Sequence, residues 1–261
     1  MIEQRLKDFP LRSSAGISYR ESGVGPALVM LHGIGGSSAA WLFQLEGIEQ
    51  FRVIAWDAPG YGTSKPLAQS EPRAADYAQA LHAFIESLEL RDFTLVANSL
   101  GGLMAAAHAR THPERVRGIV MISPAGGHGG DRVKLAERLK QLDELGPEGM
   151  AEKRSPTLLG RKAPPIALEL VQWSQRRINP PGYRQAAHCL AMGRLVDDAK
   201  SFDRPVLVFC GSEDVITPEA GCKAIAKAYP HGEYRSLPGI GHQAQIEDPT
   251  TINAAIESFA A

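Results

Sequence analysis

The chain has 261 residues, of which 44% are hydrophobic and 22% charged, with a formal net charge of −1. These values are ordinary for a globular protein with a large core, and the charge argues against nucleic acid or an anionic membrane surface as the main partner. The N-terminal residues 1–8 contain no apolar signal segment. No apolar run approaches the roughly 20 residues that cross a bilayer. We therefore expect a soluble cytoplasmic protein.

The first sixty residues are predicted to form strands joined by tight turns. Residues 17–20 alternate apolar and polar side chains, whereas 27–31 and 53–56 are continuous apolar runs. The first pattern is typical of a half-buried strand and the second of a fully buried one. Between the two apolar strands, residues 37–50 are expected to form a helix.

The middle of the chain continues the alternation of strands and helices. Apolar side chains recur at three- and four-residue spacing over residues 72–90, which predicts an amphipathic helix. Apolar strands are expected at 93–97 and 116–123, with a helix between them. Short apolar strands that alternate with helices indicate a parallel sheet covered on both faces.

After residue 130 the pattern changes. Residues 131–201 contain no strand-like run, only helical patterns separated by proline pairs. The strand pattern returns at 206–209, and the chain is expected to end with a helix at 218–229, a strand at 233–235 and a helix at 248–259. We expect residues 1–125 and 202–261 to form an α/β core, and residues 126–201 to form an inserted helical cap.

Ser99 lies between an apolar strand and a helix. A serine at such a corner projects its hydroxyl out of the sheet, beside the amide groups of the helix start. Ala97 and Gly101 are small enough to let the backbone turn sharply. Ala97 stands where the motif G-x-S-x-G has its first glycine. The structural alternative is an ordinary connection with Ser99 as a helix N-cap.

A serine nucleophile needs a base, and the base needs a group that orients it. Asp214 follows the strand 206–209, and His242 follows Gly241 in a later loop. Both loops come at the ends of strands, where open α/β sheets bind ligands. Glu213 is a rival for the acid, and a turn role is the alternative for Asp214.

These motifs together resemble the α/β-hydrolase fold over nearly the whole chain. The matching segments are His32-Gly33, residues 57–64, the corner at Ser99, the Asp214 loop and Gly241-His242. The resemblance implies a mostly parallel eight-stranded sheet flanked by helices, with a helical cap inserted after the sixth strand. The chain order Ser99, Asp214, His242 matches the catalytic triad of these enzymes.

The resemblance also implies the roles of the site residues. Ser99 would attack a carbonyl, His242 would transfer its proton, and Asp214 would orient His242. The amides of Ile34 and Leu100 would form the oxyanion hole. We expect His32 to support this loop and Asp57 to serve in a turn. Six residues are expected to line the substrate pocket: Gly33, Asn98, His128, Trp173, Arg177 and Gln243.

The leading functional hypothesis is a serine hydrolase of small esters, lactones or related carbonyl compounds. Asn98-Ser99 and Gly241-His242 also resemble the carbon–carbon bond hydrolases of aromatic ring-cleavage products, although Gln243 stands where that group has tryptophan. That group binds the substrate carboxylate with a cap arginine, for which Arg176, Arg177 and Arg184 are candidates. A perhydrolase or oxygenase activity, and a non-catalytic receptor on the same scaffold, are further alternatives.

The expected partner is a small-molecule substrate. The cysteines, histidines and carboxylates show no metal-ligand spacing, so no metal is expected. The glycine-rich loop 33–36 has neither the lysine of a phosphate loop nor the spacing of a dinucleotide motif, so no nucleotide cofactor is expected. Three cysteines that cannot all pair suit a reducing compartment. The oligomeric state is left open, with a homodimer as one option.

Overall fold

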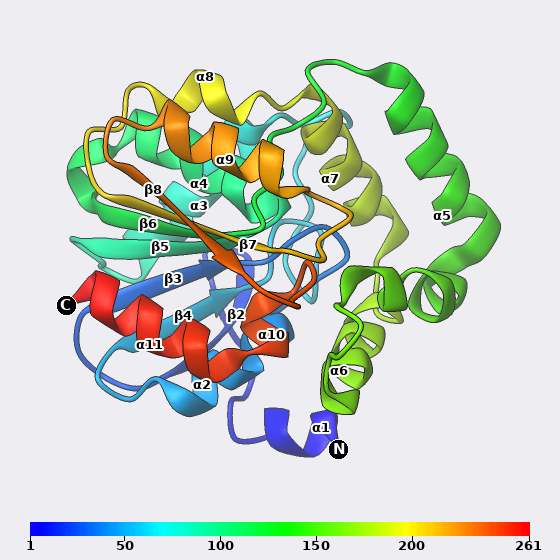
Figure 1. Ribbon diagram of the computed structural model, residues 1–261, viewed down its shortest axis with the longest axis horizontal. Coiled ribbons are helices and arrows are strands. Elements are labelled where there is room, and N and C mark those ends of the chain that lie inside the picture. The colour runs from blue at the N-terminus through cyan, green and yellow to red at the C-terminus, as the bar shows by residue number, and fades with distance from the viewer.

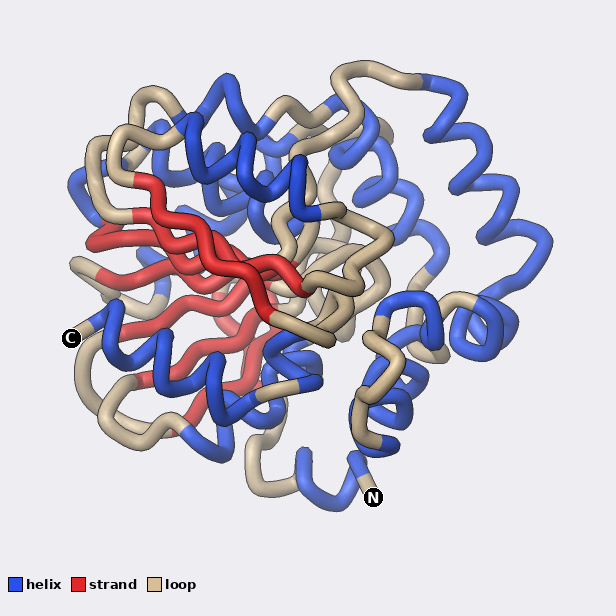
Figure 2. The backbone as a smooth tube through the Cα atoms, viewed as in Figure 1, coloured by secondary structure: helices blue, strands red, loops and turns tan.

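The computed structural model describes residues 1–261 and contains one eight-stranded sheet, drawn in red in Figure 2. Its strands are β1 (Arg12–Ser14), β2 (Ile17–Ser22), β3 (Ala27–Leu31), β4 (Arg52–Trp56), β5 (Phe93–Asn98), β6 (Val116–Ile122), β7 (Val206–Gly211) and β8 (Gly232–Leu237). Their spatial order is β1-β2-β4-β3-β5-β6-β7-β8. Strand β2 runs opposite to the other seven, so its pairings with β1 and β4 are antiparallel and all others are parallel. The expected α/β fold class is confirmed.

Helices cover both faces of the sheet (Figure 1). One face packs against α3 (Ala74–Ser87), α4 (Leu100–Thr111), α8 (Leu195–Ala199) and α9 (Glu219–Ala228), and the other against α2 (Leu42–Gly47) and α11 (Pro249–Ala260). Along β3, Val29 and Leu31 join the hydrophobic cluster of the first face, and Leu28 and Met30 join that of the second. The two-residue period of a strand sends successive side chains to opposite faces. A strand buried on both faces therefore needs apolar residues throughout.

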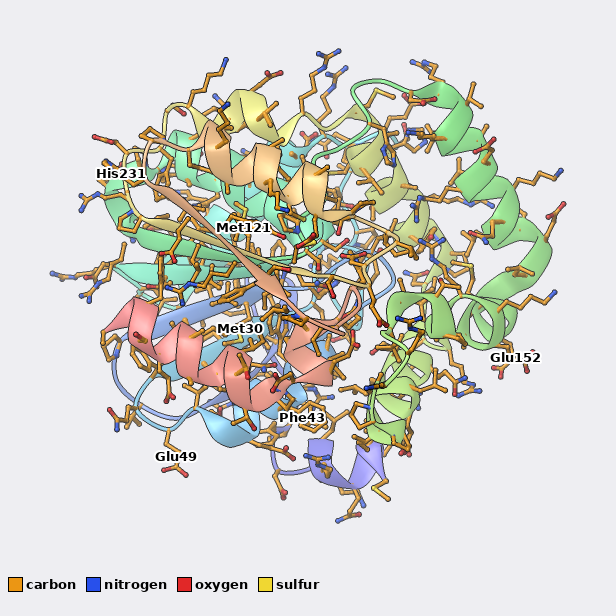
Figure 3. The ribbon with its side chains drawn as sticks, in the orientation of Figure 1. Met30, Phe43, Glu49, Met121, Glu152 and His231 are labelled. Atoms are coloured by element: carbon orange, nitrogen blue, oxygen red, sulfur yellow. The ribbon has the colours of Figure 1, made fainter.

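The side chains follow the same division between interior and surface. In Figure 3, Met30 and Met121 lie within the sheet, whereas Glu49, Glu152 and His231 lie at the edge of the molecule. Both methionines are fully buried. No helix combines the length and the apolar character that crossing a membrane requires.

Between β6 and β7 the chain contains helices and loops but no strand. It forms α5 (Arg132–Lys153), α6 (Pro165–Gln175) and α7 (Pro180–Met192), followed by α8. The first three lie together on one side of the molecule, beyond the ends of the strands (Figures 1 and 2). Helix α8 instead packs on α4 and α9 of the core. The residues at which core and cap divide remain a prediction.

Two short elements at the N-terminus have no counterpart in the sequence analysis. Helix α1 (Ile2–Leu6) is only five residues long, and Ile2 and Leu6 are buried in a cluster shared with α6. Strand β1 is a three-residue edge strand. The helix expected at 37–50 is a 3-10 turn (Ser38–Trp41) followed by α2, and a short helix α10 (Ala244–Glu247) precedes α11. Elements this short depend on tertiary contacts for their stability, and they contain too little periodicity to be predicted from the sequence.

Candidate active site

Ser99 occupies the sharp turn between β5 and α4. Its backbone is at φ 52° and ψ −118°, a conformation that costs a non-glycine residue on the order of 1–3 kcal/mol. The turn is held because the amide of Ser99 donates to Ile122 O over 3.1 Å. A Cβ atom at Gly101 would lie 2.3 Å from Leu31 O, so only glycine fits there. The Ser99 side chain is almost fully buried and lines a cavity.

The two residues before Ser99 are both fixed by the surrounding structure, and Ala97 fits where the motif G-x-S-x-G has its first glycine. Ala97 is fully buried and pairs with Leu31 of β3, so its methyl group is accommodated within the sheet. The side-chain Nδ2 of Asn98 donates to Ile122 O (3.1 Å) and His242 O (3.2 Å). Asn98 thereby ties the Ser99 turn to the loop that carries His242.

The structure brings Asp214 and His242 together. Asp214 lies in the loop after β7, and His242 lies in the loop after β8. Asp214 Oδ2 and His242 Nδ1 are 2.9 Å apart, and both side chains are buried. Glu213 instead accepts hydrogen bonds from the backbone and side chain of Arg161 at the surface. Asp214, and not Glu213, is therefore the carboxylate that contacts His242.

Thr217 was not singled out from the sequence, although its contacts place it beside the pair. Its hydroxyl lies 2.7 Å from Asp214 Oδ2 and 3.1 Å from His242 Nδ1. Asp214 Oδ1 accepts from the amides of Ile216 (2.8 Å) and Thr217 (2.9 Å). Burial alone would raise the pKa of Asp214, but the hydrogen bond and charge of His242 and the Thr217 donors lower it to about 2. The carboxylate is therefore ionised and fixed at neutral pH.

A buried carboxylate also connects the cap to the His242 loop. Glu247 Oε2 accepts from the amide of Gly160 in the cap (2.8 Å) and from that of Gly241 (3.0 Å). The His242 amide donates to Leu158 O, also in the cap, over 3.0 Å. Burial raises the pKa of Glu247, and the backbone donors oppose that rise. The segment 158–160 and the histidine loop are thus joined by buried hydrogen bonds.

Two backbone amides near Ser99 are suited to bind an anion. Leu100 is the first residue of α4, and the first N–H groups of a helix have no partner within it. The amide of Ile34 donates no hydrogen bond to the protein. His32 supports this loop, because its Nδ1 lies 2.8 Å from Gly33 O and its Nε2 accepts from the Ala58 amide. Asp57 accepts from the Ser38 amide and the Ser18 hydroxyl, in keeping with a turn role.

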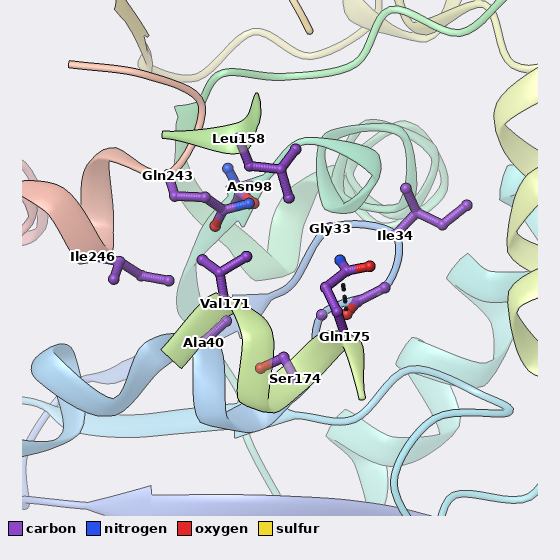
Figure 4. Close-up of a pocket in the computed structure, with 12 residues that line it drawn as sticks. Gly33, Ile34, Ala40, Asn98, Leu158, Val171, Ser174, Gln175, Gln243 and Ile246 are labelled. Atoms are coloured by element: carbon purple, nitrogen blue, oxygen red, sulfur yellow. Dashed lines mark hydrogen bonds between the residues drawn. The ribbon is translucent and has the colours of Figure 1, made fainter. Parts of the chain in front are cut away.

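Ser99 and His242 share one cavity of about 60 Å³. Four of the expected site residues line it with them: Gly33, Ile34, His128 and Gln243. Asn98 lies at an adjoining smaller cavity, shown in Figure 4, where Gln175 donates to Gly35 O over 3.4 Å.

Trp173 and Arg177 do not reach this cavity. They line a separate one of about 260 Å³ beside Asp57. The Arg177 guanidinium stacks 3.9 Å from the Trp173 ring centre and pairs with Glu3. Neither side chain lines the cavity of Ser99 and His242, contrary to the expectation that both line the substrate pocket.

The other two candidate arginines of the cap also lie at the surface. Arg176 pairs with Glu148, and Arg184 pairs with Asp143. The arginines that line the cavity of Ser99 are Arg138 and Arg154. The sequence contains a signal for Arg138, because it lies three residues after Leu135 and four before Leu142, both buried.

The chain belongs to the alpha/beta hydrolase fold family, whose model matches residues 26–249. It is 27% identical over 266 residues to the (E)-2-((N-methylformamido)methylene)succinate hydrolase of Acinetobacter baylyi, covering 97% of each chain. It is a hydrolase.

Solved structures agree with this fold. An esterase from Thermogutta terrifontis matches with a TM-score of 0.86 at 23% identity, covering 96% of this chain and 97% of that one. The enol-lactonase from Burkholderia xenovorans matches with a TM-score of 0.85 at 21% identity, covering 96% and 99%.

Proposed function

We propose that the protein is a serine hydrolase that cleaves a small ester or lactone through Ser99, His242 and Asp214. The observation that carries this proposal is the buried 2.9 Å contact of His242 with Asp214, in a loop that faces the same cavity as the Ser99 turn. Ser99 and His242 line the same cavity, so a carbonyl compound bound there would meet both side chains. The esterase and enol-lactonase with this fold support the choice of bond.

The proposed reaction has an acylation step and a deacylation step. Ser99 Oγ forms a bond to the carbonyl carbon while His242 Nε2 accepts its proton, and the amides of Ile34 and Leu100 stabilise the oxyanion. His242 then passes the proton to the leaving oxygen as the carbon–oxygen bond breaks. Water attacks the acyl-enzyme in the same way, and releases the acid and free Ser99. Asp214, with its low pKa, holds His242 in the tautomer whose Nε2 is unprotonated.

The acyl chemistry is tested with a substrate panel and one variant. The panel holds p-nitrophenyl esters of increasing chain length, several lactones and one ring-cleavage dienone. We expect turnover of esters or lactones by the wild type, and loss of at least about 1,000-fold in kcat for Ser99→Ala with the fold intact by circular dichroism. Turnover of the dienone alone would favour carbon–carbon bond hydrolysis. Substantial residual activity in Ser99→Ala would refute the proposal.

A further inference from the structure

The cavity of Ser99 and His242 contains two positive side chains without a negative partner. Arg138 lies in the first half of α5, and Arg154 directly follows its last residue. Both line the cavity, and no aspartate or glutamate does. The kink of α5 at Gly146 lies between them, so both ends of the bent helix contribute to one cavity.

Most of the hydrogen-bond donors of these two side chains are unused. Arg138 Nη1 donates to the Tyr183 hydroxyl over 3.2 Å, and Arg154 Nη1 donates to Gln141 Oε1 over 3.1 Å. A guanidinium carries five N–H donors, and these two make no other side-chain hydrogen bond. Neither forms an ion pair, although Arg176 of the same cap has a carboxylate partner. The unused donors and charges point to a ligand that supplies acceptors.

Its surroundings make the charge of Arg154 costly without an anion. Burial, followed by the charge of Arg138, lowers the pKa of Arg154. A partly buried positive charge is stabilised by an opposite charge with good hydrogen-bond geometry. His128 lines the same cavity, and its pKa is lowered by burial and then by Lys134 and Arg138.

The charged residues beside the cavity do not neutralise Arg138 and Arg154. Both arginines, with His128, also line an adjoining open cleft of about 630 Å³. This cleft contains the carboxylates of Glu137 and Glu144, and Glu144 lies 3.7 Å from the Lys140 ammonium. Neither carboxylate is paired with Arg138 or Arg154. An anion that enters through the cleft therefore finds the two guanidinium groups unoccupied.

We propose that Arg138 and Arg154 bind a carboxylate of the substrate, so that the enzyme selects esters or lactones that carry a second, ionised carboxyl group. This inference rests on the proposed function, because it places the reacting carbonyl at Ser99 in the same cavity. The planar guanidinium fork matches the two oxygens of a carboxylate. The bound carboxylate holds the rest of the substrate at a fixed distance from Ser99.

Matched ester pairs test this selectivity. Monomethyl succinate, glutarate and adipate are compared with methyl butanoate, pentanoate and hexanoate, in which a methyl group replaces the carboxylate. Turnover is followed by acid release in a pH-stat at pH 7. We expect at least about a tenfold higher kcat/KM for the anionic member at one or more chain lengths. Equal kcat/KM within each pair at all three lengths would overturn the proposal.

Arginine variants assign the preference to residues. We expect Arg138→Gln and Arg154→Gln each to raise KM for the preferred anionic ester about tenfold, with little change for its neutral partner. Arg138→Lys should retain part of the preference, because it keeps the charge without the fork. Arg176→Gln is the control, since it removes the same charge from an exposed, paired arginine of the cap. Equal effects of the two cavity variants on both esters would contradict the assignment.

A binding measurement separates this inference from the proposed function. Calorimetry with Ser99→Ala measures binding of the three monomethyl esters without turnover, and adding Arg138→Gln or Arg154→Gln should weaken it about tenfold or more. Thermal melts confirm that each variant is folded. Absence of turnover with intact, arginine-dependent binding would contradict the proposed function and support the anion site. Absence of binding to folded Ser99→Ala would overturn the anion site, whatever the outcome for catalysis.

Discussion

Asp214→Asn changes one atom in the buried pair and has two separable consequences. The asparagine oxygen can still accept from the amides of Ile216 and Thr217, which now bond Asp214 Oδ1. Its NH₂ group then replaces Oδ2 and faces His242 Nδ1 and the Thr217 hydroxyl. A donor at that position favours the tautomer in which Nδ1 accepts and Nε2 carries the proton. His242 then cannot accept the proton of Ser99.

The first consequence is catalytic. A histidine held in the wrong tautomer lowers kcat by on the order of 10³–10⁴ in a serine triad, and KM should change little because the cavity is unaltered. Steady-state kinetics on the best ester measures both values. Glu213→Gln is the matched control, because it removes the adjacent, exposed carboxylate, and its kcat should stay within about twofold of the wild type.

The second consequence is a pH-dependent loss of stability. The pKa of Asp214 falls from an ordinary 3.8 to about 2 in the folded protein, which corresponds to about 2 kcal/mol at ~1.4 kcal/mol per pKa unit. Because the folded-state pKa is the lower one, this stabilisation is complete well above pH 4 and is lost as the pH falls through about 2. Urea unfolding of both proteins from pH 7 to pH 2 should show a gap that closes toward low pH. A kcat within tenfold of the wild type, or a gap that does not depend on pH, would refute the reasoning.

Three further substitutions test the parts of the site separately. Ser99→Gly should abolish turnover yet raise the free energy of unfolding by about 1 kcal/mol in urea titrations, because glycine relieves the strain of the positive φ. A lower free energy of unfolding would show that the turn is unstrained. Thr217→Val should lower kcat about tenfold with KM unchanged, since it removes the hydroxyl bond to Asp214, and unchanged kcat would leave the hydroxyl without a positioning role. Glu247→Gln should lower the free energy of unfolding by about 2 kcal/mol in thermal melts and lower kcat, because an amide cannot accept from every donor that now bonds the carboxylate. Unchanged stability would contradict the linkage of the cap to the His242 loop.

Much of the fold could be predicted because runs of neighbouring apolar residues determine its buried strands. The buried strands, such as 27–31 and 93–97, are largely apolar runs, and the hydrophobic clusters on both faces of the sheet explain why: in these two strands Thr94 is the one polar residue. Helix α1 and strand β1 were missed, since the buried positions of α1 arise from contact with the distant α6. Propensity and periodicity do not report such contacts.

In the site, too, the residues placed by local sequence could be predicted, whereas those placed by packing could not. Ser99, Asp214 and His242 follow strands, so their convergence could be predicted from topology, and the structure brings Asp214 and His242 within 2.9 Å. The cap was harder, because the face that a helix presents to the core depends on how the helix packs. Arg177 is turned outward by Glu3 and Trp173, whereas Arg138 shares the buried face of Leu135 and Leu142. Thr217 was missed because its role depends on a hydroxyl position that only the folded loop defines.

Reaction with a fluorophosphonate tests the central claim most directly. The folded wild-type protein is incubated with the reagent and digested, and the modified peptide is identified by mass spectrometry, beside Ser99→Ala and a heat-unfolded sample. An activated serine predicts one adduct per chain, on Ser99, that is absent from both controls. No adduct on Ser99 in the folded protein would contradict the assignment of Ser99, His242 and Asp214 as the catalytic residues.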